Sequence, residues 1–261
     1  MRWDLGDPNT CRIGGEMPEI AYADGVPCWV DHLATDPLGA KEFYGGLFEW
    51  DFVAAGGRYD LIGHGDGLIG GLGPAPPGPH RAAAWNVYLA TRDADVTRTE
   101  VRRLGGLVLP EPTSGPGRLA GRLFFAIDPD GAPVGFWEGP REQATVLAGE
   151  PGAMCWHELY VRNPTVADGF YGGLFDTLTT GPLYKIGGVP QVGRLRSGGR
   201  PHWLPYFGVA HLPTWTPAAI AAGARVVGLS PTRPGTAALV LRDPWDAPFG
   251  VIEAPRQSVT E

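Results

Sequence analysis

Hydrophobic and polar residues alternate along residues 26–34 with the period of two that is typical of a β-strand. Trp29 and Asp31 share one face of this segment, whereas Val30 and His32 share the other. The segment is therefore predicted to form a strand with two distinct faces.

A helical period replaces this alternation after residue 36. Asp36 is a residue type that caps helices well, and Pro37 suits the first helical position. The apolar stripe of the predicted helix consists of Leu38, Phe43, Leu47 and Phe48. We expect a helix that begins at residue 37 and loosens at the glycine pair 45–46.

Short apolar segments bounded by glycines follow the helix and predict three strands, at residues 50–54, 59–62 and 68–72. The same order of strand, helix and three strands recurs further along the chain. Its first strands begin at Trp85, Trp156 and Trp203, and its helices are predicted at 93–104, 164–174 and 217–222. Four such modules account for almost the whole sequence.

The hexapeptide Phe-Tyr-Gly-Gly-Leu-Phe occurs twice, at residues 43–48 and 170–175. A Cys-Trp pair lies fifteen residues upstream of each copy, so both features repeat at an offset of 127 residues. Solenoid repeats have periods of roughly 20–50 residues, and this period is much longer. The sequence therefore predicts two similar globular halves.

We expect an α+β fold of two tandem domains, at residues 25–140 and 151–255, each built of two βαβββ modules. Residues 1–24 are predicted to form an N-terminal arm. A linker at 141–150 and a tail at 256–261 complete the chain.

Composition narrows the possible functions. The chain has 261 residues, 43% of them hydrophobic, without an apolar run long enough for a membrane span or a secretory leader, so we expect a cytoplasmic protein. A net charge of −7 argues against a nucleic-acid partner, because phosphate binding needs a basic surface. Three scattered cysteines do not suggest a disulfide framework or a thiolate metal site.

The first strand, the Asp-Pro helix start, the Phe-Tyr pair and the later Asp-Pro-Asp-Gly turn at 128–131 together resemble the vicinal oxygen chelate superfamily. That superfamily includes glyoxalase I, extradiol dioxygenases and the fosfomycin- and bleomycin-resistance proteins. The chain looks like the tandem, two-domain members of actinobacterial secondary metabolism, over about residues 25–255. The resemblance implies that the curved sheets of each domain enclose one cavity.

The resemblance also maps the metal-ligand positions of the family onto this sequence. One ligand stands fourteen residues before the Phe of Phe-Tyr, one opens the matching strand of the other module, and one lies seven residues after the first Asp of the turn. The mapped positions hold Trp29, Trp85 and Gly135 in the first half, and Trp156, Trp203 and Gly250 in the second. An indole offers no lone pair to a cation and glycine offers no side chain, so the resemblance implies two metal-free sites without a cofactor.

Two alternatives stay open at these positions. Glu138 and Glu253 lie three residues beyond the glycines and are possible displaced ligands, although strand alternation turns them to the opposite face. The four tryptophans either plug a vestigial site or form the walls of a ligand pocket. Indoles at cavity-facing positions suit a flat, conjugated and largely apolar ligand.

Asp31 and Glu158 are the best candidates for acid–base chemistry. Each lies two residues after a cavity-facing Trp, hence on the same face, where apolar surroundings would raise the pKa of a carboxylate. The alternative is a strand-end carboxylate in water or paired with an arginine. His157 is a third candidate, but His157 and His32 alternate to the helix-covered face unless a bulge reverses the assignment.

Further residues are possible contacts to a ligand. Tyr59 and Tyr184 begin matched middle strands and are predicted to present their phenols inward. Arg194 and His202 have no counterpart in the first half, and such asymmetry favours a single working cavity. The tyrosines that alternate away from Trp85 and Trp203, which are Tyr88 and Tyr206, are expected in core packing.

Three functions follow from these patterns. The first is a metal-independent enzyme of secondary metabolism that uses a carboxylate or His for dehydration, cyclisation or isomerisation of an aromatic or polyketide-like molecule. The second is a resistance protein that sequesters a small molecule without catalysis. The third, a metal-dependent glyoxalase or dioxygenase, is opposed by the substituted ligand positions. The chain is expected to be a monomer or a homodimer.

Overall fold

The computed structural model describes residues 22–78, 82–110, 121–139, 149–175, 178–180, 183–186, 189–230 and 237–254. They form two eight-stranded mixed sheets and four helices, which confirms the predicted α+β architecture of two tandem domains with two βαβββ modules each. The predicted linker at 141–150, the tail at 256–261 and the arm at 1–24 lie largely outside the described residues.

The first sheet has the strand order β2-β3-β4-β1-β5-β8-β7-β6. Its two modules meet where β1 and β5 pair antiparallel at the centre. The elements are β1 (Pro27–Ala34), α1 (Pro37–Phe48), β2 (Asp51–Gly56), β3 (Tyr59–His64), β4 (Gly67–Pro74), β5 (Ala84–Ala90), α2 (Ala94–Arg103), β6 (Leu107–Val108), β7 (Arg122–Ile127) and β8 (Pro133–Glu138).

The second sheet repeats this arrangement in the order β10-β11-β12-β9-β13-β16-β15-β14, with β9 and β13 antiparallel at its centre. Its elements are β9 (Met154–Val161), α3 (Pro164–Phe175), β10 (Leu178–Thr180), β11 (Leu183–Ile186), β12 (Val189–Arg196), β13 (His202–Val209), α4 (Leu212–Ala221), β14 (Arg225–Leu229), β15 (Ala238–Arg242) and β16 (Pro248–Glu253).

Most helices begin and end close to where the local sequence predicts. Asp36 caps α1 by accepting a hydrogen bond from the Gly39 amide at 3.2 Å, and Asp93 caps α2 in the same way. The predicted start of the last helix at residue 217 is wrong, because α4 begins at Leu212 and contains Pro217 in its interior. Pro217 was predicted at the first helical position, but it lies more than one turn inside the helix.

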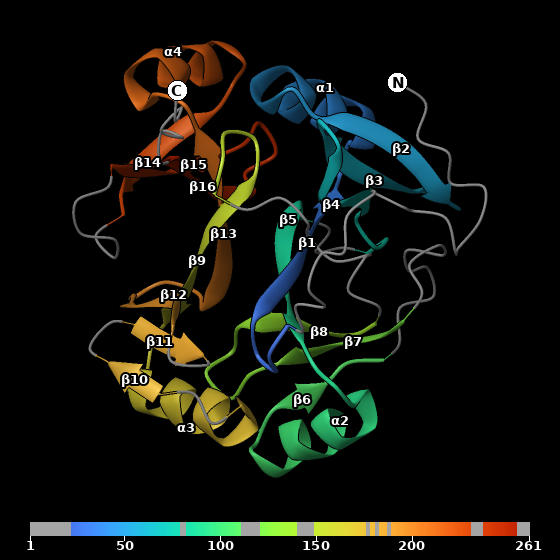
Figure 1. Cartoon of the computed structure of the whole chain (residues 1–261), viewed down its shortest axis with the longest axis vertical. Helices are drawn as coiled ribbons and strands as arrows, with labels where there is room; N and C mark the ends of the chain where they lie inside the picture. Colours follow the sequence, from blue (N-terminus) through green and yellow to red (C-terminus); the bar gives the residue numbers. More distant parts are fainter. Residues whose placement is uncertain are drawn as a thin grey trace, which may run out of the picture.

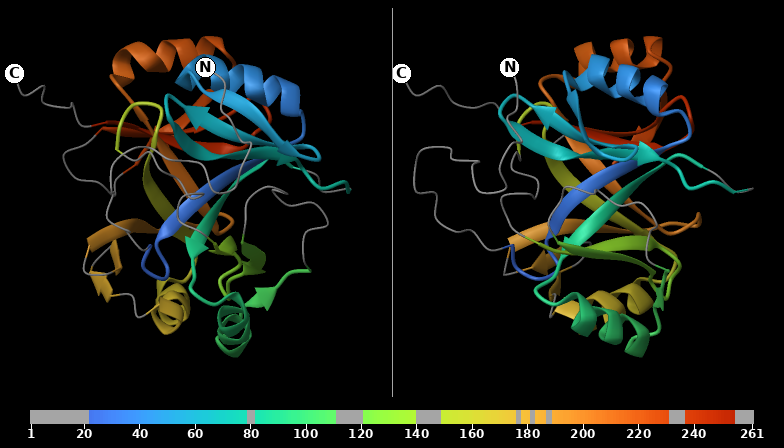
Figure 2. Two further views of the ribbon diagram at one scale, coloured as in Figure 1. Left: turned by 45° about the vertical axis from the view of Figure 1, so that its right-hand side comes forward. Right: turned by 90° about the vertical axis from the view of Figure 1, so that its right-hand side faces the viewer.

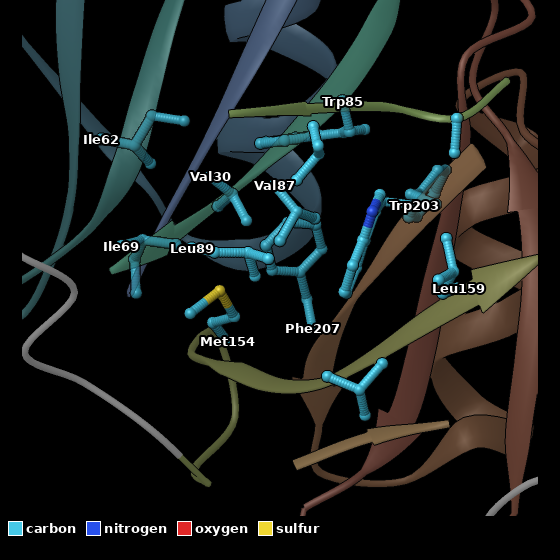
Figure 3. Packing of buried hydrophobic residues seen from close by; sticks show 14 of the residues in the cluster. Val30, Ile62, Ile69, Trp85, Val87, Leu89, Met154, Leu159, Trp203 and Phe207 are labelled. Carbon is cyan, nitrogen blue, oxygen red and sulfur yellow. The ribbon is translucent and has the colours of Figure 1, made fainter. Parts of the chain in front are cut away.

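The two sheets lie back to back, with α1 beside α4 at one end and α2 beside α3 at the other (Figure 1). Two further views show the same arrangement (Figure 2). One apolar core contains residues of both sheets and lies between them, including Trp85, Val87, Trp203 and Phe207 (Figure 3). We call the sheet faces that border this core the inner faces, and the opposite faces the outer faces.

Two matching hydrogen-bond chains cross from one domain to the other. In the first, the Trp85 indole donates to the Tyr44 hydroxyl at 2.9 Å, which donates to Asp243 at 3.0 Å. In the second, Trp203 donates to Tyr171 at 3.0 Å, which donates to Asp128 at 3.0 Å. In both chains of hydrogen bonds, the Phe-Tyr helix of one half therefore binds the β-turn of the other half.

Two further tryptophans donate hydrogen bonds across the same interface between the domains. The Trp50 indole donates to the Gly152 carbonyl at 2.7 Å, and Trp215 donates to the Leu47 carbonyl at 3.0 Å. Each of these indole N–H groups has an acceptor, so removing it from water costs little free energy. The aromatic interface is therefore stabilised by both packing and hydrogen bonds. Within the described part of the chain, no helix is long and apolar enough to cross a membrane.

Candidate functional site

The outer face of the first sheet holds a buried carboxylate among aromatic side chains. Asp31 is 3% exposed and accepts hydrogen bonds from Tyr88 at 2.7 Å, Asn86 at 2.8 Å and Tyr59 at 3.4 Å. The Trp29 indole donates to the Tyr59 hydroxyl at 3.3 Å. β1, β3 and β5 thus bring their polar groups to one point, as predicted for Trp29, Asp31 and Tyr59.

The outer face of the second sheet holds a matching carboxylate with different partners. Glu158 is fully buried and accepts hydrogen bonds from Tyr206 at 2.5 Å and from Tyr160 at 2.9 Å. Its other oxygen accepts a short hydrogen bond from the Ser230 hydroxyl. Trp156 lies on the same face, in a cluster with Tyr206. The carboxylate two residues after the Trp is therefore on the outer face in both halves.

His202 lies at the edge of the second cluster. Its ring stacks on that of Tyr160, with centroids 4.8 Å apart and planes 5° from parallel. Burial lowers the pKa of His202, while a hydrogen bond to the Arg200 carbonyl partly opposes this shift. His202, which has no counterpart in the first half, therefore lies beside the Glu158 cluster, and its lowered pKa favours the neutral imidazole.

Burial also shifts the pKa of the groups around Asp31. Desolvation raises the pKa of Asp31 above its ordinary value, and the hydrogen bonds from Asn86 and Tyr88 partly offset this effect. The pKa values of Tyr88 and Tyr59 are raised well above the ordinary phenol value, first by burial and then by the Asp31 charge. The Asp31 carboxyl is therefore easier to protonate than that of a surface aspartate.

Two glycines make room for the tyrosines that bind the carboxylates. A Cβ atom on Gly135 would overlap the Tyr88 ring, and one on Gly250 would overlap the Tyr206 ring. These glycines stand at the positions where the resemblance placed the third metal ligand. The space that a ligating side chain would use is filled by a phenol ring from the neighbouring strand.

Gly250→Ala is expected to destabilise the protein by roughly 1–3 kcal/mol, because the Tyr206 ring must move away from the new methyl group. That movement would also weaken the hydrogen bond from Tyr206 to Glu158. Urea unfolding measures the loss, and Gly198→Ala is the control, since nothing lies within 4 Å of a Cβ there. Equal stability of the two variants would contradict the close packing of the Tyr206 ring against Gly250.

The side chains of the two outer faces do not fit the metal ion of the family. Within the described ranges, no group of three or more His, Cys, Asp and Glu residues is arranged to hold a metal ion. The oxygens of Asp31 and Glu158 already accept hydrogen bonds from phenols. The alternative ligands Glu138 and Glu253 instead accept the backbone N–H groups of Ala94 and Leu212, at the starts of α2 and α4.

The predicted orientation of Trp85 and Trp203 is wrong. Both side chains point to the inner face, where they belong to the core between the sheets (Figure 3). The residues of these strands that reach the carboxylates are Tyr88 and Tyr206, which were expected in core packing. The count from the family pattern assigned the residues of these two strands to the faces of the sheet one position out of register. A shift of one residue turns every side chain of a strand to the opposite face.

Tyr184 and Arg194 also lie away from the outer faces. The Tyr184 hydroxyl donates to Asp168 of α3 at 2.8 Å, and Arg194 forms an ion pair with the same carboxylate at 3.0 Å. Leu183 pairs with Gly193 as Leu61 pairs with Gly71, so Tyr184 takes the core-facing position of Ile62 rather than that of Tyr59. Both residues stabilise the α3 side of the domain, and the prediction that they line the ligand site is wrong.

The two strand histidines lie on the inner faces, as strand alternation predicted. His32 is fully buried, with Nε2 3.2 Å from Asp243. His157 is 6% exposed and lies 3.0 Å from the Met154 sulfur. The sheet separates His157 from Glu158, so placing both in one catalytic group was wrong.

His157 is expected to make the protein less stable as the pH falls. Burial lowers its pKa from 6.5 to about 3, so between these values the unfolded chain binds a proton that the folded protein does not. The free energy of unfolding should fall with decreasing pH in this window, with a limiting slope of about 1.4 kcal/mol per pH unit. Urea unfolding from pH 7 to pH 4 measures the slope, and His157→Gln should reduce it; an unchanged slope would contradict the burial effect.

Sequence reasoning missed Ser230, Tyr160 and Asn86 as partners of the carboxylates. Tyr160 could have been found, because it follows Glu158 by two residues on the same strand face. Asn86 lies directly opposite Asp31 across the strand pair, but this register was not apparent from the sequence. Ser230 comes from beyond the end of β14, and only the tertiary fold brings it to Glu158.

No protein-family model matches the chain. It is 32% identical over 263 residues to a candidate glyoxylase, CFP32, of Mycobacterium tuberculosis, covering 92% of this chain and 100% of that protein. It is 29% identical over 261 residues to the anthracycline biosynthesis protein DnrV of Streptomyces peucetius, covering 89% of this chain and 94% of that protein.

Two solved structures show the same fold. The Mn(II)-bound glyoxalase from Novosphingobium aromaticivorans has a TM-score of 0.63 and 15% identity, with 88% of this chain and 83% of that chain covered. Homoprotocatechuate 2,3-dioxygenase from Arthrobacter globiformis has a TM-score of 0.62 and 14% identity, with 94% and 85% covered.

Paired βαβββ modules in two back-to-back sheets, each with a tryptophan and a carboxylate on its outer face, define a tandem two-domain protein of the glyoxalase-like class. The chain belongs to the vicinal oxygen chelate superfamily, together with the mycobacterial CFP32 proteins.

Proposed function

We propose that the protein is a metal-independent tailoring enzyme of secondary metabolism that moves protons on an aromatic or polyketide-like small molecule. The reaction class is dehydration, cyclisation or isomerisation, none of which changes the net oxidation state of the substrate. One observation carries the proposal. Each outer face places a carboxylate, Asp31 or Glu158, beside tryptophan and tyrosine side chains, with phenol hydroxyls bonded to the carboxylate.

A buried carboxylate among aromatic rings is suited to general acid–base catalysis. Low polarity raises the pKa of such a group toward the working pH, as burial does for Asp31. The phenols of Tyr88 and Tyr206 donate hydrogen bonds to the charged form and hold the carboxylate in one orientation. A carboxylate held in this way can take a proton from a carbon or oxygen of a bound ring system and return it elsewhere.

The nature of the substrate is inferred from the walls of the site and from the relatives. Indole and phenol rings favour flat, conjugated ligands, because stacking buries large areas without polar cost. DnrV and a second relative, DauV of a Streptomyces species, are named as anthracycline biosynthesis proteins. An anthracycline contains fused aromatic rings with hydroxyl and ketone groups, and this chemistry suits a site with carboxylate and hydroxyl groups.

Hydrogen exchange into anthrone tests the proposal without knowledge of the natural substrate. Anthrone is a flat ketone with an acidic methylene group. A carboxylate that removes one methylene proton leaves the electron pair in the ring enolate, and a deuteron from heavy water then returns to the same carbon. Mass spectrometry under anaerobic conditions measures deuterium uptake with and without the protein.

The same assay decides between the remaining functions. Exchange that is faster with the protein and unchanged after treatment with a chelator supports metal-independent acid–base chemistry. Activity that is lost with a chelator and restored by a divalent metal would favour a glyoxalase or dioxygenase type of site instead. Quenching of tryptophan fluorescence by anthrone without any gain in exchange would favour a protein that sequesters its ligand.

A further inference from the structure

The helices α2 and α4 occupy matching places in the two halves, but only α2 has a charged surface. Their first residues correspond, because Glu138 accepts the Ala94 N–H and Glu253 accepts the Leu212 N–H. α2 contains five charged residues, which are Asp95, Arg98, Glu100, Arg102 and Arg103. The residues of α4 at the same positions are Pro213, Thr216, Ala218, Ile220 and Ala221, so α4 has no charged residue.

The uncharged surface continues from α4 into β14, the strand that follows it. Ile220 of α4 is 53% exposed, and Val227 and Leu229 of β14 are 55% and 78% exposed. α4 lies close to β14 at this edge of the second sheet (Figure 1). We call the exposed residues of the two elements and their connection the α4–β14 surface; they are Pro213, Thr214, Pro217, Ala218, Ile220, Ala221, Ala222, Gly223, Arg225, Val226, Val227 and Leu229.

β14 forms one edge of the second sheet, with β15 as its only strand neighbour in the described part of the chain. Val226 and Leu229 pair with residues of β15 that belong to the core, so their side chains lie on the inner face, which α4 also borders. The register shifts at Val227, and such a bulge disfavours extension of the sheet by a further strand. A partner is therefore expected to pack against the side chains of the α4–β14 surface.

An apolar surface of this kind usually marks a contact site. Soluble proteins expose single apolar side chains, but rarely a group of neighbouring ones without charges among them. Of the seven large hydrophobic side chains that are exposed in the described part of the chain, four lie on the α4–β14 surface. α2 shows the usual alternative, because it covers the same place in the first half with charges. The contrast between the two helices points to a partner for α4.

The charges around this surface indicate what kind of partner fits it. Between residues 212 and 230 the only charged residue is Arg225, so a nucleic acid or a strongly charged protein finds no matching charges. Arg225 forms an ion pair with Asp246 at 2.7 Å, and both side chains are 67% exposed. A twofold dimer needs a surface that is complementary to itself, and a border with one positive and one negative group meets this requirement. The chain has a net charge of −7, and two copies approach with little repulsion at a segment without Asp or Glu.

We propose that the α4–β14 surface binds the same surface of a second copy of the chain, which gives a homodimer with twofold symmetry. Ile220, Val226 and Leu229 form the apolar centre of the contact, and Arg225 and Asp246 lie at its border. Each copy contributes twelve exposed residues, fewer than the roughly 20–30 of a standard interface, so we expect a dissociation constant in the micromolar range. The proposal concerns assembly and does not depend on the proposed enzymatic function.

Sedimentation velocity over a series of protein concentrations tests the proposal. The wild-type protein is expected to shift from monomer to dimer as its concentration rises. Ile220→Arg introduces the residue type that α2 has at the matching position. It is expected to raise the dissociation constant at least tenfold, because a charge at the contact loses water without gaining a partner. Leu229→Lys is expected to act in the same direction, and the two changes together should leave only monomer.

The control is Val96→Arg, which replaces an apolar side chain of α2 that is 58% exposed. It adds the same charge to the matching module of the first half and should leave the dissociation constant unchanged. Circular dichroism shows whether each variant folds. Leu229→Lys carries the test alone if Ile220→Arg does not fold, since the Leu229 side chain is the more exposed of the two.

A wild-type protein that remains monomeric over the whole series would overturn the proposal, and binding of that monomer to phosphatidylcholine vesicles would assign the surface to a lipid instead. A dimer that neither variant weakens, or that Val96→Arg weakens equally, would place the contact elsewhere on the molecule. Species that grow beyond the dimer with concentration would indicate head-to-tail association and would exclude the twofold contact.

Discussion

Glu158→Gln combined with Asp31→Asn, so that neither outer face keeps its carboxylate, is expected to slow deuterium exchange into anthrone by about 10²–10⁴-fold, the usual contribution of a general acid–base group. Glutamine keeps the shape of the side chain and an oxygen that can accept the Tyr206 and Tyr160 hydrogen bonds. It cannot take up the methylene proton, because an amide is not a base at ordinary pH. The loss should therefore appear in the rate of exchange at saturating anthrone rather than in anthrone binding.

The control for this variant is Glu253→Gln. Glu253 lies in the same domain and accepts the Leu212 N–H at the start of α4, away from the outer face. Thermal unfolding of both variants shows whether any change in rate arises from lost structure. A double variant that binds anthrone and exchanges it at the wild-type rate would remove both carboxylates from the mechanism.

The sequence was informative wherever local pattern decides the structure. The repeated Phe-Tyr helix and the Cys-Trp strand predicted the modules and their duplication, which the two matching sheets confirm. Alternation by two residues placed Asp31 with Trp29, and Glu158 with Trp156, on the faces where they are found. Burial then raises the pKa of Asp31 in the expected direction.

The errors arose where a register or a distant partner decides the orientation. Alternation within β5 correctly put Trp85 and Tyr88 on opposite faces, but the family pattern assigned the Trp85 face to the cavity, whereas that face belongs to the core. The sequence pattern predicts Asp128 only as the first residue of a turn, and Asp243 begins the matching turn of the second half. Their second role, as acceptors for Tyr171 and Tyr44 of the opposite domain, joins residues 43 and 199 positions apart, which no local pattern reveals.

Asp243→Ala is expected to destabilise the protein by about 3–5 kcal/mol, because several buried groups lose their hydrogen-bond acceptor at about 1–3 kcal/mol each and the losses are not fully additive. Asp243 is 4% exposed, and one of its oxygens bonds to Tyr44 at 3.0 Å and to His32 at 3.2 Å. The other oxygen accepts the N–H groups of Trp245 at 2.9 Å and Ala247 at 2.8 Å. Alanine would leave all four groups without this acceptor, at the turn and across the domain interface together.

Two comparisons separate the contributions of the interface and the turn. Asp128→Ala removes the matching acceptor for Tyr171 and for the turn N–H groups, but the position that corresponds to His32 is Leu159, so a smaller loss is expected. Asp246→Asn changes an exposed charge in the same turn, and an exposed ion pair contributes only about 0–1 kcal/mol. Asparagine also tolerates the positive φ of 70° at that position. Urea unfolding of the three variants gives the order, and an Asp243→Ala protein no less stable than Asp246→Asn would show that the two domains are held together by apolar packing without the hydrogen-bond chain.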